Sequence, residues 1–188
     1  MTQKKVDRNK NVTEYDLLRI FDNLSNLETA FLNEANLFLK IGGQNGHIHT
    51  MDLFTSAIIN RSLFLMRGYV TLAKENNYIS AVPLIRIQLD NCLRFFASTL
   101  VSDYNDFYIE YLKGTHIRNL TDNTNAKMTD TYLVTKLDKL FPGLHNLYIN
   151  SSGHIHFSNE HSFLQTRLLA NTERTIETLI GYSDCYSI

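Results

Sequence analysis

The chain has 188 residues with 18 basic and 19 acidic side chains, and its net charge of −1 gives no bulk attraction to nucleic acid or membrane. Hydrophobic residues make up 44% of the chain and charged residues 20%, a balance that excludes disorder over most of its length. Eight glycines and two prolines are too few for a turn-rich all-β protein. A chain of this length can bury a core that needs no metal or disulfide to support it.

The first residues are polar and basic, and we expect residues 1–12 to form a disordered tail ahead of a single helical domain over residues 13–188. This tail lacks the apolar run of a secretory signal. Charged residues interrupt every long apolar stretch, so none reaches the roughly 20 residues of a membrane span. The sequence therefore predicts a cytoplasmic protein with no membrane association.

Apolar residues recur at spacings of three and four in three segments, which predicts long helices at residues 13–41, 51–76 and 80–100. The second is apolar around much of its circumference and should lie at the centre of the bundle. On the third, Ser80 is the expected N-cap, and Cys92 lies on the stripe that we expect to be buried. Hairpin packing of these three helices should supply most of the core.

Shorter helices follow in the second half of the chain. One is expected at 103–114, and an Asn- and Thr-rich loop covers 118–127. A fifth helix, capped by Thr129 or Asp130, should run to about residue 141, and a short one that contains Leu144, Leu147 and Tyr148 should follow. A last helix is expected at 159–182. The sequence thus predicts an all-α fold, a single-domain helical bundle of about five to seven helices.

Three charged residues on the third helix are spaced four apart and therefore lie on one face. They are Arg86, Asp90 and Arg94, on the far side from most of the apolar stripe. In one interpretation they form an exposed salt-bridge ladder worth a few tenths of a kcal/mol per pair. In the other they line a cleft, where Asp90 orients two guanidinium groups that bind phosphate.

The tetrapeptide Gly-His-Ile-His occurs twice, at residues 46–49 and 153–156, and contains four of the seven histidines. Two such pairs could supply four imidazole ligands to Zn, Fe or Ni. Residues two apart converge on one ion only in particular turns, so the alternative is a histidine near a helix start, hydrogen-bonded to backbone or to a carboxylate. The candidate ligands are His47, His49, His154 and His156.

Residues 148–157 combine hydroxyls, an amide and two imidazoles, groups that a core accepts only when they are mutually satisfied. A Ser–His nucleophile pair is conceivable, with Ser151 or Ser152 beside His154 or His156. The segment has no nucleophile elbow and no oxyanion loop, which argues against hydrolase-type catalysis. The chain also has no Gly-rich phosphate loop or dinucleotide fingerprint, and we expect no cofactor.

Residues 50–165 resemble a group of uncharacterised bacterial all-helical proteins that are distantly akin to the HEPN superfamily. One part of the resemblance is an early arginine on one helix followed by an Arg-x3-Asp element on the next. The other is a tyrosine followed at short intervals by serine and histidine. The residues that carry it are Arg61, Arg86, Asp90, Tyr148, Ser151 or Ser152, and His156.

The resemblance implies a helical bundle, commonly a homodimer, that acts in toxin–antitoxin or phage-defence systems. Many HEPN proteins are metal-independent endoribonucleases with an Arg-x4–6-His motif, and in this sequence no arginine precedes a histidine at that spacing. If catalysis occurred, His156 would be the base for a ribose 2′-hydroxyl, Arg86 would stabilise the phosphorane, and Asp90 would hold Arg86. The further binding residues would be Arg94, Tyr148, Ser152, His154 and Arg61.

Three hypotheses follow from the sequence. The first is an RNA-directed protein, a candidate endoribonuclease, in which the charged face of the third helix meets the Ser/His segment in one cleft. The second is a non-catalytic module for dimerisation or partner binding, in which the polar cluster only locks helix packing. The third is a histidine metal site, which requires the two His-x-His pairs to converge on one point.

Overall fold

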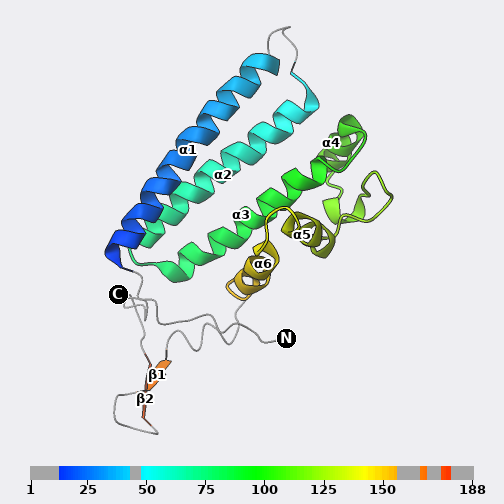
Figure 1. Cartoon of the computed structure of the whole chain (residues 1–188). Helices are drawn as coiled ribbons and strands as arrows, with labels where there is room; N and C mark the ends of the chain where they lie inside the picture. The colour runs from blue at the N-terminus through cyan, green and yellow to red at the C-terminus, as the bar shows by residue number, and fades with distance from the viewer. Residues whose placement is uncertain (1–12, 43–47, 156–165, 169–174, 179–188) are drawn as a thin grey trace.

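The computed structural model describes residues 13–42, 48–155, 166–168 and 175–178, and in this part of the chain it shows the expected all-α bundle with six α-helices (Figure 1). The expected tail at 1–12 lies outside the described residues. None of the described helices has an apolar stretch of the length that a bilayer crossing requires. The helices are α1 (Glu14–Gly42), α2 (Thr50–Lys74), α3 (Tyr78–Ser98), α4 (Tyr104–Leu112), α5 (Asp130–Asp138) and α6 (Leu144–Ser152), with a 3₁₀ turn at Ile117–Asn119.

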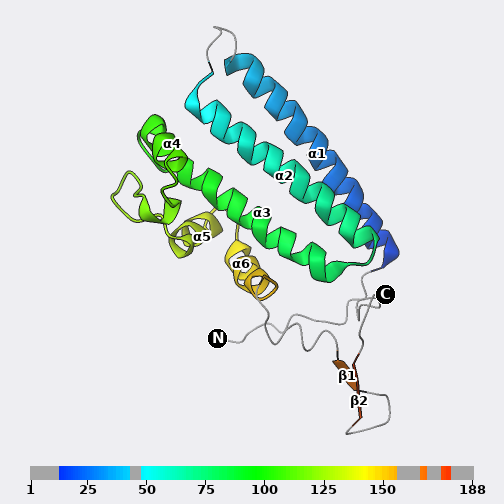
Figure 2. The same ribbon diagram turned by 180° about the vertical axis from the view of Figure 1, so that it is seen from behind.

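The three long helices lie side by side, with α2 between α1 and α3 (Figures 1 and 2). The central position predicted for the second helix is confirmed. Local signals set the ends of these helices. The His49 backbone N–H donates to Asp52 in the first turn of α2, and Asn77 caps α3 by accepting from the Ser80 N–H at 3.3 Å. The prediction of Ser80 as the cap of α3 was therefore wrong by three residues.

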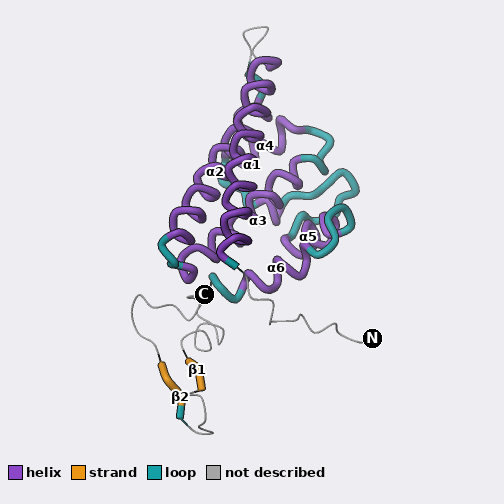
Figure 3. The backbone as a smooth tube through the Cα atoms, turned by 60° about the vertical axis from the view of Figure 1, so that its left-hand side comes forward, coloured by secondary structure: helices purple, strands orange, loops and turns teal. Residues whose placement is uncertain are grey.

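The main cluster of buried hydrophobic side chains joins α2 and α3 to the short helices and their loop. Figure 3 shows these short helices gathered on one side of the long helices. Phe54 of α2 meets Phe107 of α4 edge to face, with ring centroids 5.5 Å apart. None of the described side chains of α1 is buried. Of the thirteen buried hydrophobic residues that the structure describes, seven lie on α2 and α3, so the prediction that the long helices supply most of the core holds for these two helices and fails for α1. The core cluster contains Phe54, Leu93, Ala97, Phe107, Ile117, Met128, Leu133, Val134 and Leu137.

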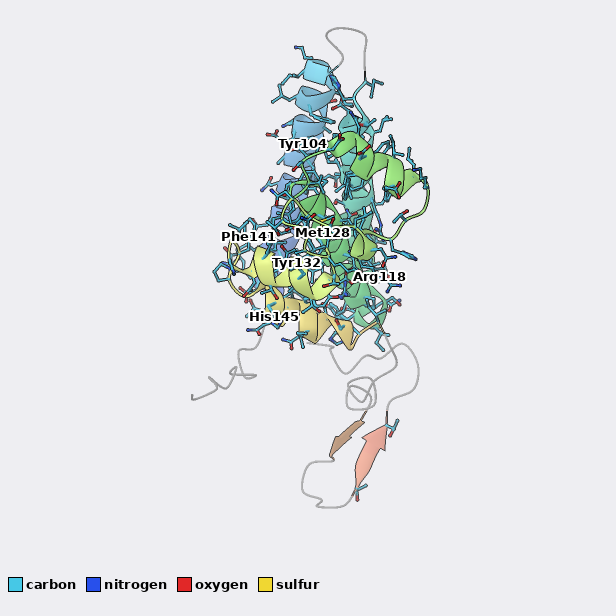
Figure 4. All side chains as sticks on the ribbon, turned by 90° about the vertical axis from the view of Figure 1, so that its right-hand side faces the viewer. Tyr104, Arg118, Met128, Tyr132, Phe141 and His145 are labelled. Atoms are coloured by element: carbon cyan, nitrogen blue, oxygen red, sulfur yellow. The ribbon has the colours of Figure 1, made fainter. Side chains whose placement is uncertain are left out.

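A single buried carboxylate organises the loop before α5. Asp122 accepts hydrogen bonds from the Thr124 hydroxyl at 2.7 Å, from the Ala126 N–H at 3.0 Å and from the Tyr132 hydroxyl, and it pairs with Lys136 at 3.0 Å. Figure 4 shows Tyr132 on α5 beside this loop. The loop predicted at 118–127 is thus confirmed, and its shape comes from one charge that satisfies several donors.

The stability of the protein should depend on pH through this carboxylate. Hydrogen bonds, first from Tyr132 and then from Thr124, hold the pKa of Asp122 well below its ordinary value. As the pH falls, the Asp122 carboxylate is therefore protonated at higher pH in the unfolded chain than in the folded chain. Its contribution to the free energy of unfolding is complete above about pH 4 and is lost as the pH falls further. We expect the wild-type melting temperature to fall more steeply between pH 5 and pH 3 than that of Asp122→Asn. Equal slopes in the two melting series would contradict this assignment.

The end of the chain departs from the prediction. Instead of a helix at 159–182, the described residues there form two antiparallel strands, β1 (Thr166–Leu168) and β2 (Ile176–Thr178). Thr166 pairs with Thr178, and Leu168 pairs with Ile176. Three of these six residues are β-branched, a composition that favours extended backbone over helix. The helix predicted to reach residue 141 also ends earlier, at Asp138.

Candidate functional site

The predicted charged residues of α3 lie in a partly buried cluster between α3, α5 and α6. Arg86 is only 8% exposed and pairs with Asp90 one turn further along the helix. Its Nε donates to the Ser152 hydroxyl of α6 at 3.3 Å, and its guanidinium carbon lies 3.9 Å from the centre of the Tyr148 ring. Arg86 therefore contacts α6 through both a hydrogen bond and a cation–π contact.

The cluster continues to α5 through a second ion pair. Arg94 of α3 pairs with Asp130, the first residue of α5, at 2.7 Å. Tyr148 links the two pairs, because its ring covers Arg86 while its hydroxyl lies 3.4 Å from Asp130. We call Arg86, Asp90, Arg94, Asp130 and Tyr148 the charged cluster. Burial, followed by the charge of Asp130, raises the pKa of Tyr148.

The charged cluster is electrically balanced, with each arginine matched by one aspartate. The four atoms that meet in the two pairs, one on each partner, are shielded from solvent. The interpretation of Arg86 and Asp90 as an exposed ladder was wrong, because α6 packs over this face of α3. The sequence predicts Asp130 only as a helix cap. Nothing in the residues around it indicates an ion pair with Arg94, which lies 36 positions earlier in the chain. The contacts of the charged cluster therefore link α3 to α5 and α6, and the ion pairs fix the positions of the two arginines.

The two serines of α6 use their hydroxyl protons within the helix. Ser151 donates to the Tyr148 carbonyl at 3.1 Å and Ser152 donates to the same carbonyl at 2.8 Å. The Ser152 hydroxyl also accepts a hydrogen bond from Arg86, so it makes one hydrogen bond as donor and one as acceptor. This arrangement orients the serine for packing and leaves it unsuited to nucleophilic attack.

The remaining predicted site residues fall elsewhere. Arg61 is exposed on α2 and takes no part in the ion pairs of the charged cluster. His154 is partly buried just after α6, and His156 lies outside the described residues. His49 is the N-cap of α2, which agrees with the alternative of a histidine at a helix start, and His47 lies outside the described part. Within the described ranges, no group of three or more His, Cys, Asp or Glu side chains is placed to hold a metal ion.

A second polar contact joins α2 to α3. The Ser62 hydroxyl accepts from the Asn91 amide at 2.7 Å and from the Gln88 amide at 3.0 Å, and it donates to the Ile58 carbonyl at 2.9 Å. Asn91 is fully buried. Cys92 next to it is exposed, so the expectation of a buried thiol was wrong. These amides fix the register of α2 against α3 through hydrogen bonds that only one alignment can make.

An apolar groove lies beside the N-terminal half of α3, next to α6. It has a volume of about 370 Å³, and its walls come from α1, α2, α3 and α6. Gln88 is the one polar side chain of the lining. The helical spacing of several of these apolar residues predicts that they are buried in the core. In the structure they line this open groove instead. The lining residues are Ile20, Leu24, Leu65, Met66, Tyr69, Leu84, Ile85, Gln88, Leu89 and Leu147.

Comparisons with known proteins add no family. Neither the protein-family models, nor the curated proteins, nor the solved structures contain a match to this chain. The resemblance to HEPN proteins therefore stays a prediction from short motifs, and function has to be argued from the geometry described above.

Proposed function

We propose that this chain is a non-catalytic helical module that binds a protein partner through the apolar groove between α1 and α3. The observation that carries this proposal is the lining of the groove, in which nine of ten side chains are apolar or aromatic. Open apolar surface of this kind costs free energy in water, and in soluble proteins it marks sites of association. An uncharged apolar groove suits an apolar helix and does not suit a nucleic acid.

The charged cluster also supports this proposal. Arg86 and Arg94 are already neutralised by Asp90 and Asp130, so their positive charges are poorly placed to bind a phosphate. Their contacts to α5 and α6 stabilise the packing of the short helices on α3. The cluster then acts in folding, and the groove acts in binding.

A photo-crosslinker attached to Cys92 tests the proposal. Cys92 is exposed one turn beyond Gln88, whose amide lies 3.7 Å from its sulfur, so a benzophenone placed there reaches the groove. We expect protein adducts in a cell extract that resist ribonuclease and disappear in the Ile85→Glu variant. Cys185→Ser is introduced in every chain so that the label has one position. The same label on Leu112→Cys in a Cys92→Ser, Cys185→Ser chain is the control, since Leu112 is exposed on α4. Adducts that are independent of position, or that ribonuclease removes, would contradict the proposal.

An RNA-directed nuclease is the second candidate. The observation in its favour is that one cluster forms where α3 meets α5 and α6, and it contains Arg86, Asp90, Arg94, Tyr148 and Ser152. In this candidate His156, four residues beyond Ser152, would act as the base. The arrangement lacks an unpaired cation among the named arginines, which is why it ranks below the binding module.

Incubation with total cellular RNA separates the two candidates. We expect RNA to stay intact on a denaturing gel, with or without EDTA, because the arginines of the charged cluster are paired and Ser152 is engaged. Cleavage that survives EDTA and is lost in His156→Ala would overturn the binding module as the main function. His156→Ala is the informative variant because Arg86→Ala would also disturb folding.

A further inference from the structure

Helix α1 lies at the outer edge of the three long helices and is held less firmly than the other two (Figures 1 and 2). Its inward face consists of side chains that are only partly buried and that alternate at spacings of three and four. They lie at positions 17, 21, 24, 28, 31, 35 and 38. No described α1 side chain is fully buried, whereas α2 and α3 each contribute several that are. Because local stability follows buried contacts, α1 should be the least stable of the three.

Open space flanks the N-terminal half of α1 on two sides. One side is the apolar groove, to which α1 contributes Ile20 and Leu24. The other is a cavity of about 440 Å³ whose lining comes from α1 and α2 and includes Phe21. Leu24 and Met66 line both spaces, and around the axis of α1 Ile20 and Phe21 lie on opposite sides of Leu24. Atoms beside empty space lack packing partners, which weakens the attachment of α1 to α2.

One ion pair interrupts the apolar inward face of α1. Glu28 is the charged residue among the seven inward positions, and its carboxylate accepts a hydrogen bond from Nε of Arg67 on α2 at 2.8 Å. The Arg67 side chain is 60% exposed, so water can solvate both charges when the helices separate. An exposed pair of this kind adds little net attachment. It does make the docking of α1 sensitive to the charge at position 28.

We infer that α1 docks on α2 in a local two-state equilibrium and that only the docked state completes the apolar groove. This inference rests on the proposed function and names how its site is regulated. Undocking removes Ile20 and Leu24 from the wall of the groove, while the rest of its lining stays on α2, α3 and α6. A partner that contacts this wall binds the docked state more tightly, so the docked fraction of α1 sets the apparent affinity of the groove.

Amide hydrogen exchange of the full chain, read by mass spectrometry of its peptides, tests the local equilibrium. We expect amides in the middle of α1 to exchange at least about tenfold faster than those of α3. Glu28→Lys places a second cation beside Arg67 and should speed exchange in α1 severalfold, with α3 unchanged. Glu34→Lys is the matched control, because it makes the same charge change on the exposed face of the same helix. Equal rates in α1 and α3, or equal effects of the two variants, would overturn the inference.

Crosslinking from Cys92 separates failure of this inference from failure of the proposed function. Neither Glu28 nor Glu34 is part of the groove lining. With a benzophenone on Cys92 in Cys185→Ser chains, we expect Glu28→Lys to yield severalfold fewer protein adducts than Glu34→Lys, because more of its molecules have an incomplete groove. Equal yields would overturn regulation by α1 and leave the groove as the binding site. Absence of adducts from the wild type would overturn the proposed function and, with it, the regulatory role of α1.

Discussion

Replacing Arg86 by alanine is expected to lower the free energy of unfolding by about 3 kcal/mol. The substitution removes the cation from a site that is only 8% exposed and leaves Asp90 without its partner. It also removes the hydrogen bond to Ser152 and the cation–π contact with Tyr148. Asp90 keeps some contact with water, so the effect should lie at the lower end of the range for broken buried ion pairs.

Chemical denaturation of Arg86→Ala beside Arg61→Ala measures this effect. Arg61 is exposed on α2, and its loss should change the free energy of unfolding by no more than about 0.5 kcal/mol. Equal stabilities for the two variants would show that the charged cluster does not hold α6 on α3. A second comparison, Asp90→Ala in the Arg86→Ala background, should cost less than Asp90→Ala alone, because the partner charge is already absent.

Replacing Leu93 by alanine should cost about 3 kcal/mol, the other large effect that the structure predicts. Leu93 is fully buried in the core cluster, among side chains contributed by α2, α4 and α5. Removal of its branched end leaves a cavity that the rigid surroundings fill only in part, so the loss exceeds the transfer free energy of the missing groups.

Leu112→Ala provides the matched control for the core. Leu112 is 64% exposed, so the same chemical change should cost well under 1 kcal/mol in the same denaturation experiment. Similar costs at the two positions would contradict the placement of the core between α3 and the short helices.

The sequence predicted where the long helices lie along the chain, but it did not predict which helices pack against each other. Spacings of three and four located α1, α2 and α3 to within a few residues, because helix periodicity is a local property. The same spacing could not say which face of α3 is buried. That helix is apolar on two sides, and the choice between them depends on where α5 and α6 pack. Cys92 was placed inside for this reason and lies outside.

The candidate site shows the same division. The spacing of Arg86, Asp90 and Arg94 put them correctly on one face, since residues four apart on a helix are neighbours. The pairing of Arg94 with Asp130 depends on the fold between them, and no local pattern indicates it. The strands β1 and β2 were missed because apolar residues there also fit a helical spacing, and short segments of this kind leave the period ambiguous.

The central claim is that the charged cluster serves folding while the groove serves binding. The yield of crosslinks from Cys92 in the double variant Arg86→Met, Asp90→Leu, measured beside the wild type in a Cys185→Ser chain, tests it most directly. Apolar residues of similar volume can replace a buried ion pair with little loss of stability. The account predicts a folded variant that forms the same ribonuclease-resistant protein adducts as the wild type. Absence of adducts from the wild type, or their loss in the folded double variant alone, would contradict the account.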